Sequence, residues 1–327
     1  MNPVLEGWRG LAALLVMFAH FGPSLGVSGP VGVAAFTGVD LFFVLSGYVF
    51  AKSLFEPIPS LRAFATRRVF RILPAYWFAV MLYAFLSWSK TQDPGPWLSH
   101  LFFLHLSDAK TAYALNPAFW SLVPEVEFYL LLPVLSLLVQ GCLARFIGLI
   151  LLSLLMRQVL AFLADRETAN LAFVLLHHIP GMLIEFLLGA AVWRLQRTHQ
   201  WAHHSMLAML GLGAWLAVAF AFHAMGEPKM ESAFGVGQVS LLAALCFAFA
   251  LAGSNSRSVE SAQLRGLLFS AGSLSYGVYL FHNASLAITP NPYAAFVITI
   301  VFSLFVFLII ERPARKFGRK LALQLNS

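Results

Sequence analysis

Charged residues are scarce in this sequence: Asp, Glu, Lys and Arg together account for 11% of its 327 residues. Soluble globular domains carry about 25% charged residues, so this composition excludes an ordinary soluble enzyme. Cysteine is rarer still. Only Cys142 and Cys246 occur, and their predicted depths differ too much for a disulfide. We therefore infer no redox role.

Several sequence patterns are missing as well. A glycine-rich phosphate loop is absent, which disfavours a nucleoside triphosphate pump. No repeat, linker or low-complexity segment divides the chain, so we expect residues 1–327 to form a single membrane domain without an appended soluble domain. The first apolar run lacks the pattern of a cleavable leader and is expected to belong to the mature protein.

Apolar residues make up 60% of the chain, including 31 Phe and 8 Trp, more than one water-soluble core can bury. A membrane span needs about 20 mostly apolar residues, and ten stretches reach or approach that length. The short apolar run 97–106 cannot cross a membrane and is expected at its interface. The ten stretches are 11–26, 31–54, 73–88, 119–139, 146–163, 171–193, 206–223, 234–252, 267–288 and 294–310.

Positive charge predicts how these spans are oriented. Alternating the loops places sixteen of the 21 Lys and Arg residues on one side of the membrane, and that side is predicted to be cytoplasmic. Both termini then lie in the cytoplasm, which requires an even number of spans. The formal net charge of +7 is explained by this topology, and no nucleic-acid partner is expected.

Several ionisable side chains fall within or at the edges of the spans. A charged group at mid-bilayer costs at least about 2.5 kcal/mol, so each needs a partner, a wet cavity or a functional role. Their number predicts an all-α polytopic membrane protein of about ten transmembrane helices around a polar interior. These residues are His20, Asp40, Glu125, Glu127, Arg157, His177, His178, Glu185 and His282.

Arg9 and His20 are placed on one helix face by their spacing, with about 16 Å of rise between them. That spacing suits an extended ligand or a channel; the alternative is a topology-setting arginine and a histidine satisfied in the core. Asp40 has a similar predicted depth and could orient His20 as a general base. The alternative is a buried pair that only locks two helices. The neighbouring Ser46 and Gly47 allow close backbone approach.

Arg62, Arg67, Arg68 and Arg71 cluster on the predicted cytoplasmic side, with Arg68 and Arg71 on one helix face. Clustered guanidinium groups suit the phosphates of a phosphorylated cofactor. The simpler alternative is an anchor to anionic lipid.

Two carboxylates, Glu125 and Glu127, are about 200° apart on a helix, so only one can face the interior. Arg157 and Glu185 are expected to pair with one another in a structural role. The histidines within 199–204 lack a third ligand at matching spacing, so no metal site is expected.

Five groups of residues, taken in order along the chain, suggest a family. The first is the string Glu6–Ala13 with Arg9 and His20, and the others lie within 38–48, 68–76, 120–133 and 275–313. Together they resemble the integral-membrane acyltransferase family 3, which includes bacterial O-antigen and exopolysaccharide O-acetylases. The resemblance covers essentially the whole chain. Met182 stands where an arginine is expected, so no site is carried over there.

The resemblance implies transfer of an acyl group, usually acetyl from cytoplasmic acetyl-CoA, to a hydroxyl of a sugar or related acceptor, in the bacterial cytoplasmic (inner) membrane. On this hypothesis Arg68 and Arg71, with help from Arg9, hold the phosphates of acetyl-CoA, the acyl-donor substrate. His20, oriented by Asp40, deprotonates the acceptor hydroxyl or carries the acyl group itself.

Glu125 is predicted to act on the acceptor side, with Ser46, Tyr129, Tyr276 and His282 as substrate-binding residues. The acceptor is expected to be a carbohydrate or a lipid-linked glycan. A transporter of a sugar or anionic substrate could use the same polar interior, and it predicts substrate flux without an acyl donor. A membrane sensor or scaffold, whose arginines only hold anionic lipid, predicts no thioester hydrolysis with any acceptor.

Overall fold

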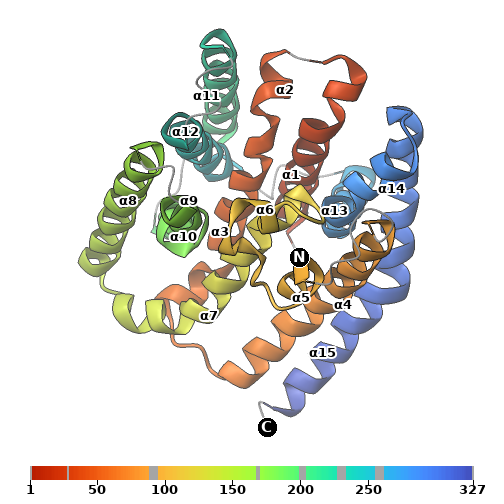
Figure 1. The fold of residues 1–327 in the computed structure, drawn as a ribbon. Coiled ribbons are helices and arrows are strands. Elements are labelled where there is room, and N and C mark those ends of the chain that lie inside the picture. Colours follow the sequence, from red (N-terminus) through yellow and green to blue (C-terminus); the bar gives the residue numbers. More distant parts are fainter. Residues whose placement is uncertain are drawn as a thin grey trace.

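The described residues form a bundle of helices, with no strand in any described range (Figure 1). A computed structural model describes residues 2–27, 29–87, 95–166, 170–198, 204–226, 233–254 and 261–325. This confirms the predicted all-α class. The helices are α1 (Pro3–Phe21), η1 (Pro23–Leu25), α2 (Pro30–Ala34), η2 (Ala35–Thr37), α3 (Gly38–Phe55), α4 (Leu61–Ser87), α5 (Gly95–Leu101), η3 (His105–Ser107), α6 (Ala109–Ala112), η4 (Pro117–Ser121), α7 (Leu122–Val139), α8 (Leu143–Arg166), α9 (Asn170–His177), α10 (Ile179–Thr198), α11 (His204–Ala224), α12 (Ala233–Ala252), α13 (Ala262–Ile288), α14 (Pro292–Val306), η7 (Phe307–Glu311) and α15 (Arg312–Gln324).

Helices occupy the positions of all ten predicted spans. Within the described residues, eight helical segments are long and apolar enough to cross a membrane. The other two predicted spans correspond to α12, whose apolar part Gly237–Ala252 is shorter, and to α13, which packs against α1 and α14. The polytopic membrane architecture is therefore confirmed.

Polar side chains set the beginnings of several helices. The Asn2 side chain accepts a hydrogen bond from the Val4 backbone N–H at 3.0 Å, with Pro3 in the first helical turn of α1. Asn291 does the same for α14, accepting from the backbone N–H of Tyr293 at 3.0 Å. Such caps satisfy backbone donors that a helix leaves unpaired and fix where it begins.

The helices α3 and α10 cross with their backbones almost touching. A Cβ atom added to Gly47 would lie 1.8 Å from the Phe186 carbonyl oxygen, and one added to Gly189 would lie 1.8 Å from that of Val44. Only glycine permits this approach. The close contact predicted at Gly47 is confirmed, and it fixes the position of the adjacent Ser46.

The segment 95–121 lies deeper in the bundle than expected. Tyr76, in the middle of α4, donates a hydrogen bond to the carbonyl oxygen of His100 at 2.7 Å, and Trp77 donates to that of Leu101 at 3.1 Å. Tyr76 is about 16 Å from the end of α4 at Ser87, from the rise per helical residue. The short helix α5 therefore lies beside the middle of α4, instead of at its end as expected for an interfacial segment.

Candidate active site

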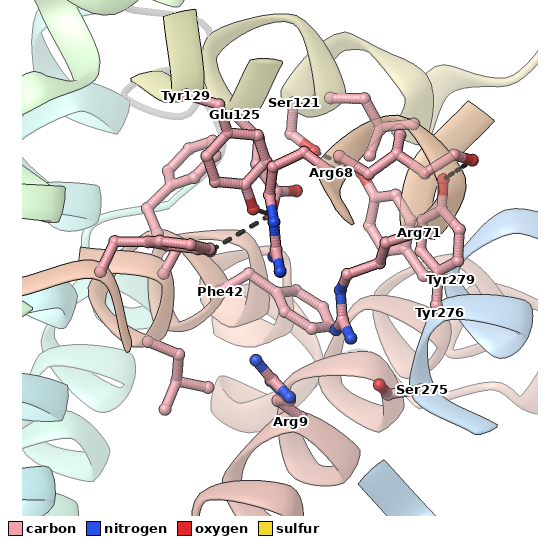
Figure 2. A pocket seen from close by; sticks show the side chains of 16 residues that line it. Arg9, Phe42, Arg68, Arg71, Ser121, Glu125, Tyr129, Ser275, Tyr276 and Tyr279 are labelled. Atoms are coloured by element: carbon pink, nitrogen blue, oxygen red, sulfur yellow. Dashed lines mark hydrogen bonds between the residues drawn. The ribbon is translucent and has the colours of Figure 1, made fainter. Parts of the chain in front are cut away.

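A pocket opens where α1, α3, α4, α7 and α13 converge (Figure 2). Seven of the ten predicted site residues line it, although they come from five separate helices. The lining consists of Arg9, Phe42, Phe43, Leu45, Ser46, Phe50, Arg68, Arg71, Ile72, Ser121, Leu122, Glu125, Tyr129, Ser275, Tyr276 and Tyr279. The prediction that these motifs gather at one site is therefore consistent with the geometry.

Three arginine side chains supply the positive charge of this pocket. Figure 2 shows Arg9, Arg68 and Arg71 pointing toward one another. Arg9 forms an ion pair with Glu6 at 2.9 Å, and the Arg68 guanidinium carbon lies 4.8 Å from the ring centroid of Phe50. The buried Nε of Arg68 has no hydrogen-bond partner. Converging guanidinium groups with an unsatisfied N–H make a site suited to an anion.

Glu125 supplies the carboxylate in the pocket lining. It accepts hydrogen bonds from the Ser46 hydroxyl at 3.2 Å and from the Tyr129 hydroxyl one helical turn away. These contacts join α3 to α7. Glu125, Tyr129 and Tyr276, which were predicted for the acceptor side, line the same pocket as the arginines that were predicted to hold phosphate.

Two tyrosines of α13 form another wall. Tyr276 donates a hydrogen bond to the Ile72 carbonyl oxygen at 3.0 Å, and the Tyr279 hydroxyl lies 2.5 Å from that of Ser121 and also donates to the carbonyl oxygen of Ala118. Tyr279 and Ser121 were not predicted as site residues. Tyr279 could have been predicted from helical spacing, because it lies three residues after Tyr276 and so shares its helix face.

A fourth arginine lies near the pocket. Arg315 forms an ion pair with Glu311 at 2.5 Å and is close enough to Arg71 and Arg9 for their charges to interact. From the sequence, Arg315 is one of the sixteen Lys and Arg residues whose predicted role is to set topology. The spacing of Glu311 and Arg315, four apart on a helix, was the signal that could have identified the pair.

His20 lies beside a second histidine. Its Nδ1 is 2.9 Å from the Val16 carbonyl oxygen and 3.3 Å from Nε2 of the buried His282. Nδ1 of His282 is in turn 3.1 Å from the Val278 carbonyl oxygen. A carbonyl oxygen can only accept, so each ring carries its proton on Nδ1 and Nε2 of His282 accepts from His20. The Nε2 lone pair of His20 is then available as a base.

The predicted pairing of Asp40 with His20 is wrong. Asp40 is 3% exposed, and its carboxyl lies beside that of Glu185 within reach of Arg157. Arg157 and Glu185 form a buried ion pair at 2.8 Å, which confirms that predicted pair. Asp40 faces this cluster because α3 packs along α10, whereas His20 belongs to α1, which packs along α13. Asp40 therefore has a structural position, away from the imidazole.

The prediction that Arg9 and His20 share one groove is also wrong. Arg9 lines the pocket, but His20 and His282 do not. The ring of Tyr279, which does line the pocket, lies 6.3 Å from that of His282 and 5.6 Å from that of Phe42. The histidine pair therefore lies behind the aromatic wall of the pocket.

The second carboxylate of α7 points elsewhere. Glu127 accepts hydrogen bonds from the His178 ring and, at 2.9 Å, from the Ile179 backbone N–H. This confirms that only one of the two glutamates faces the pocket. Histidines 199 and 203 lie outside the described residues, and within the described ranges no cluster of potential ligands could hold a metal ion.

The sequence is similar to a known protein family and to individual named proteins. Residues 2–313 match the sequence profile of a family described as an acyltransferase domain. BcsY of Komagataeibacter xylinus, whose name describes it as a membrane-bound transacylase, is 28% identical over 221 residues, covering 59% of this chain and 51% of the relative. YrhL of Bacillus subtilis, whose name describes it as a peptidoglycan O-acetyltransferase, is 30% identical over 153 residues, covering 40% of this chain and 23% of the relative. The chain thus spans about half of the first relative and about a quarter of the second. No solved structure matches it significantly.

Proposed function

Because the chain belongs to this acyltransferase family, we propose that it is a membrane acyltransferase. The acyl group, preferentially acetyl, is transferred from cytoplasmic acyl-CoA to a hydroxyl of a carbohydrate or cell-envelope acceptor. The observation that supports this proposal is the arginine pocket inside a bundle of membrane helices. We place the protein in a bacterial cytoplasmic membrane, with its sixteen clustered Lys and Arg residues on the inner side.

The negative charge of the acyl-CoA phosphates complements the positive charge of the pocket. The lining holds three arginines and one glutamate, so a phosphate group entering it meets an excess of positive charge. The buried Nε–H of Arg68 lacks an acceptor, and a phosphate oxygen would supply one. Arg71 and Arg9 complete the cluster from α4 and α1.

His20 is the proposed base. Its Nε2 takes the proton of the acceptor hydroxyl while the hydroxyl oxygen attacks the thioester carbonyl; the C–S bond breaks and the CoA sulfur leaves, taking up the proton. In the alternative route, His20 holds the acyl group and passes it on. Because His20 lies behind Tyr279, the thioester end must pass this ring in either route.

The test is transfer of label from radioactive acetyl-CoA to a panel of cell-envelope glycans by the purified protein in liposomes. We expect labelled glycan with the wild type and a loss of about 10²- to 10⁴-fold in His20→Ala, the usual contribution of a general base. His223→Ala, at an exposed position on α11, is the matched control and retains activity. Glycan flux without an acyl donor would indicate a transporter, and absence of transfer with every glycan would refute the proposal.

A further inference from the structure

An apolar groove runs along the outside of the bundle between α4 and α7. Its walls include Ala65 and Val69 from α4 and Val126 and Leu130 from α7, with Phe103 contributing from the segment before α6. The groove exists because α4 packs mainly against α15 while α7 packs against α3, so the two helices that border it are not in close contact.

This groove faces the region that lipid occupies around a membrane protein. Leu130 is 73% exposed and Val69 is 45% exposed on its walls. The α4 wall extends from Leu61 to Leu73, about 18 Å of helix. Its shape and composition therefore suit a hydrocarbon chain lying along α4.

The groove and the arginine pocket share a wall. Arg68, Ile72 and Tyr129 line both of them, so the partition is a single layer of side chains. Arg68 lies over the Tyr129 ring, 5.8 Å from its centroid, and Tyr129 donates a hydrogen bond to Glu125 inside the pocket. The apolar groove, which suits a hydrocarbon chain, therefore ends directly at the positively charged arginine pocket.

An apolar groove that ends at clustered guanidinium groups suits an amphiphile with an anionic phosphate head. We propose that the acceptor is a glycan joined through a phosphate or diphosphate to a hydrocarbon chain, and that this chain lies in the groove between α4 and α7. Arg68 lines both cavities and carries five N–H donors, so it can meet this phosphate from the groove and the donor phosphate from the pocket. The sugar hydroxyl enters the pocket past Tyr129. The proposal rests on the proposed function and selects the lipid-linked form among its acceptors.

A transfer assay tests this with two acceptors that carry the same glycan, one linked to a prenyl diphosphate and one free in water. Ala65→Trp fills the groove from an exposed position and should raise KM for the lipid-linked acceptor at least tenfold, while leaving kcat/KM for the free glycan within twofold. Leu155→Trp, at a 61% exposed position on α8, should change neither. Equal effects on both acceptors, or no effect, would contradict the proposal. A changed preference for donor chain length would assign the groove to the acyl donor instead and also contradict it.

Photolabelling without any acyl donor keeps this test separate from the proposed function. A prenyl phosphate that carries a photoreactive chain should label residues 61–73 and 126–133 of the wild type, and Ala65→Trp should remove most of this label. Excess unlabelled prenyl phosphate should compete, and phosphatidylcholine should not. Equal competition by phosphatidylcholine would show bilayer lipid only and overturn the inference, whether or not transfer is observed.

Discussion

Among single residues, the imidazole of His282 acts together with the Val16 carbonyl to determine which nitrogen of His20 is free to accept a proton. The ring of His282 has its own proton directed at the Val278 carbonyl, so it can only accept from Nδ1 of His20. This leaves Nε2 of His20 as the basic atom. A carboxylate such as Asp40 is not needed for that purpose, and Asp40 lies in a different cluster.

Replacing His282 with Leu should therefore lower kcat for acyl transfer by about tenfold, part of the contribution of a general base, with KM for acyl-CoA nearly unchanged. The physical reason is loss of one of the two acceptors that hold the His20 tautomer, since only the Val16 carbonyl then remains. His282→Gln should restore part of kcat because its amide oxygen can accept the bond. An unchanged kcat in His282→Leu, measured by label transfer, would show that the ring has only a packing role.

The stacked rings of His100 and His105 predict how stability depends on pH. Both are fully buried, with ring centroids 4.0 Å apart. Burial lowers the pKa of His100 to about 4 and that of His105 to about 3. In the unfolded chain both titrate near pH 6.5. Stability should therefore be complete above about pH 6.5 and fall as the pH drops toward 4, because the unfolded state binds more protons there.

The expected loss by pH 5 is roughly 2 kcal/mol for each histidine. Thermal unfolding of the detergent-solubilised protein between pH 8 and pH 5 measures it, and His105→Gln should reduce the slope of stability against pH. If the variant unfolds with the same pH dependence as the wild type, burial of these rings does not explain the loss of stability at low pH.

At the scale of helices, long apolar stretches were sufficient to predict the all-α polytopic architecture, because lipid selects for length and hydropathy. Within the described residues, eight helical segments are long and apolar enough to cross a membrane. The segment 95–121 could not be placed in this way, since short runs with Trp, Phe and His also occur at membrane interfaces. Its position depends on individual bonds such as those of Asn116, whose side chain donates to the Tyr83 hydroxyl at 3.1 Å and to the Leu280 carbonyl at 3.2 Å. Those partners are far away in the sequence.

The crossing of α3 and α10 predicts a strong effect of one methyl group. Gly47→Ala should destabilise the protein by about 1–3 kcal/mol, as overpacking does in tight cores, because the new Cβ would clash with the Phe186 carbonyl oxygen. It should also lower transfer by displacing Ser46. Gly148→Ala is the control, since no atom lies within 4 Å of its added Cβ. Equal melting temperatures for the two variants would argue against a tight crossing.

In the molecule as a whole, the pocket exists only where five helices meet. The sequence could indicate which residue types belong there, because Arg68, Arg71 and Glu125 are costly in a membrane without a function. It could not indicate that Glu125 faces the arginines, or that Arg315 joins them from the last helix. Those relations depend on how α7 packs against α3 and how α15 packs against α4, and no local pattern encodes that packing.

If the arginine pocket binds the acyl donor, the purified protein should bind coenzyme A, and calorimetry measures this equilibrium. We predict binding to the wild type and roughly 10- to 100-fold weaker binding to Arg71→Gln, the loss of one hydrogen bond to a charged group. Arg62→Gln, an exposed position on the same helix, should bind within twofold of the wild type. Wild-type affinity in Arg71→Gln, or no binding of coenzyme A to the wild type, would contradict binding of the donor in this pocket.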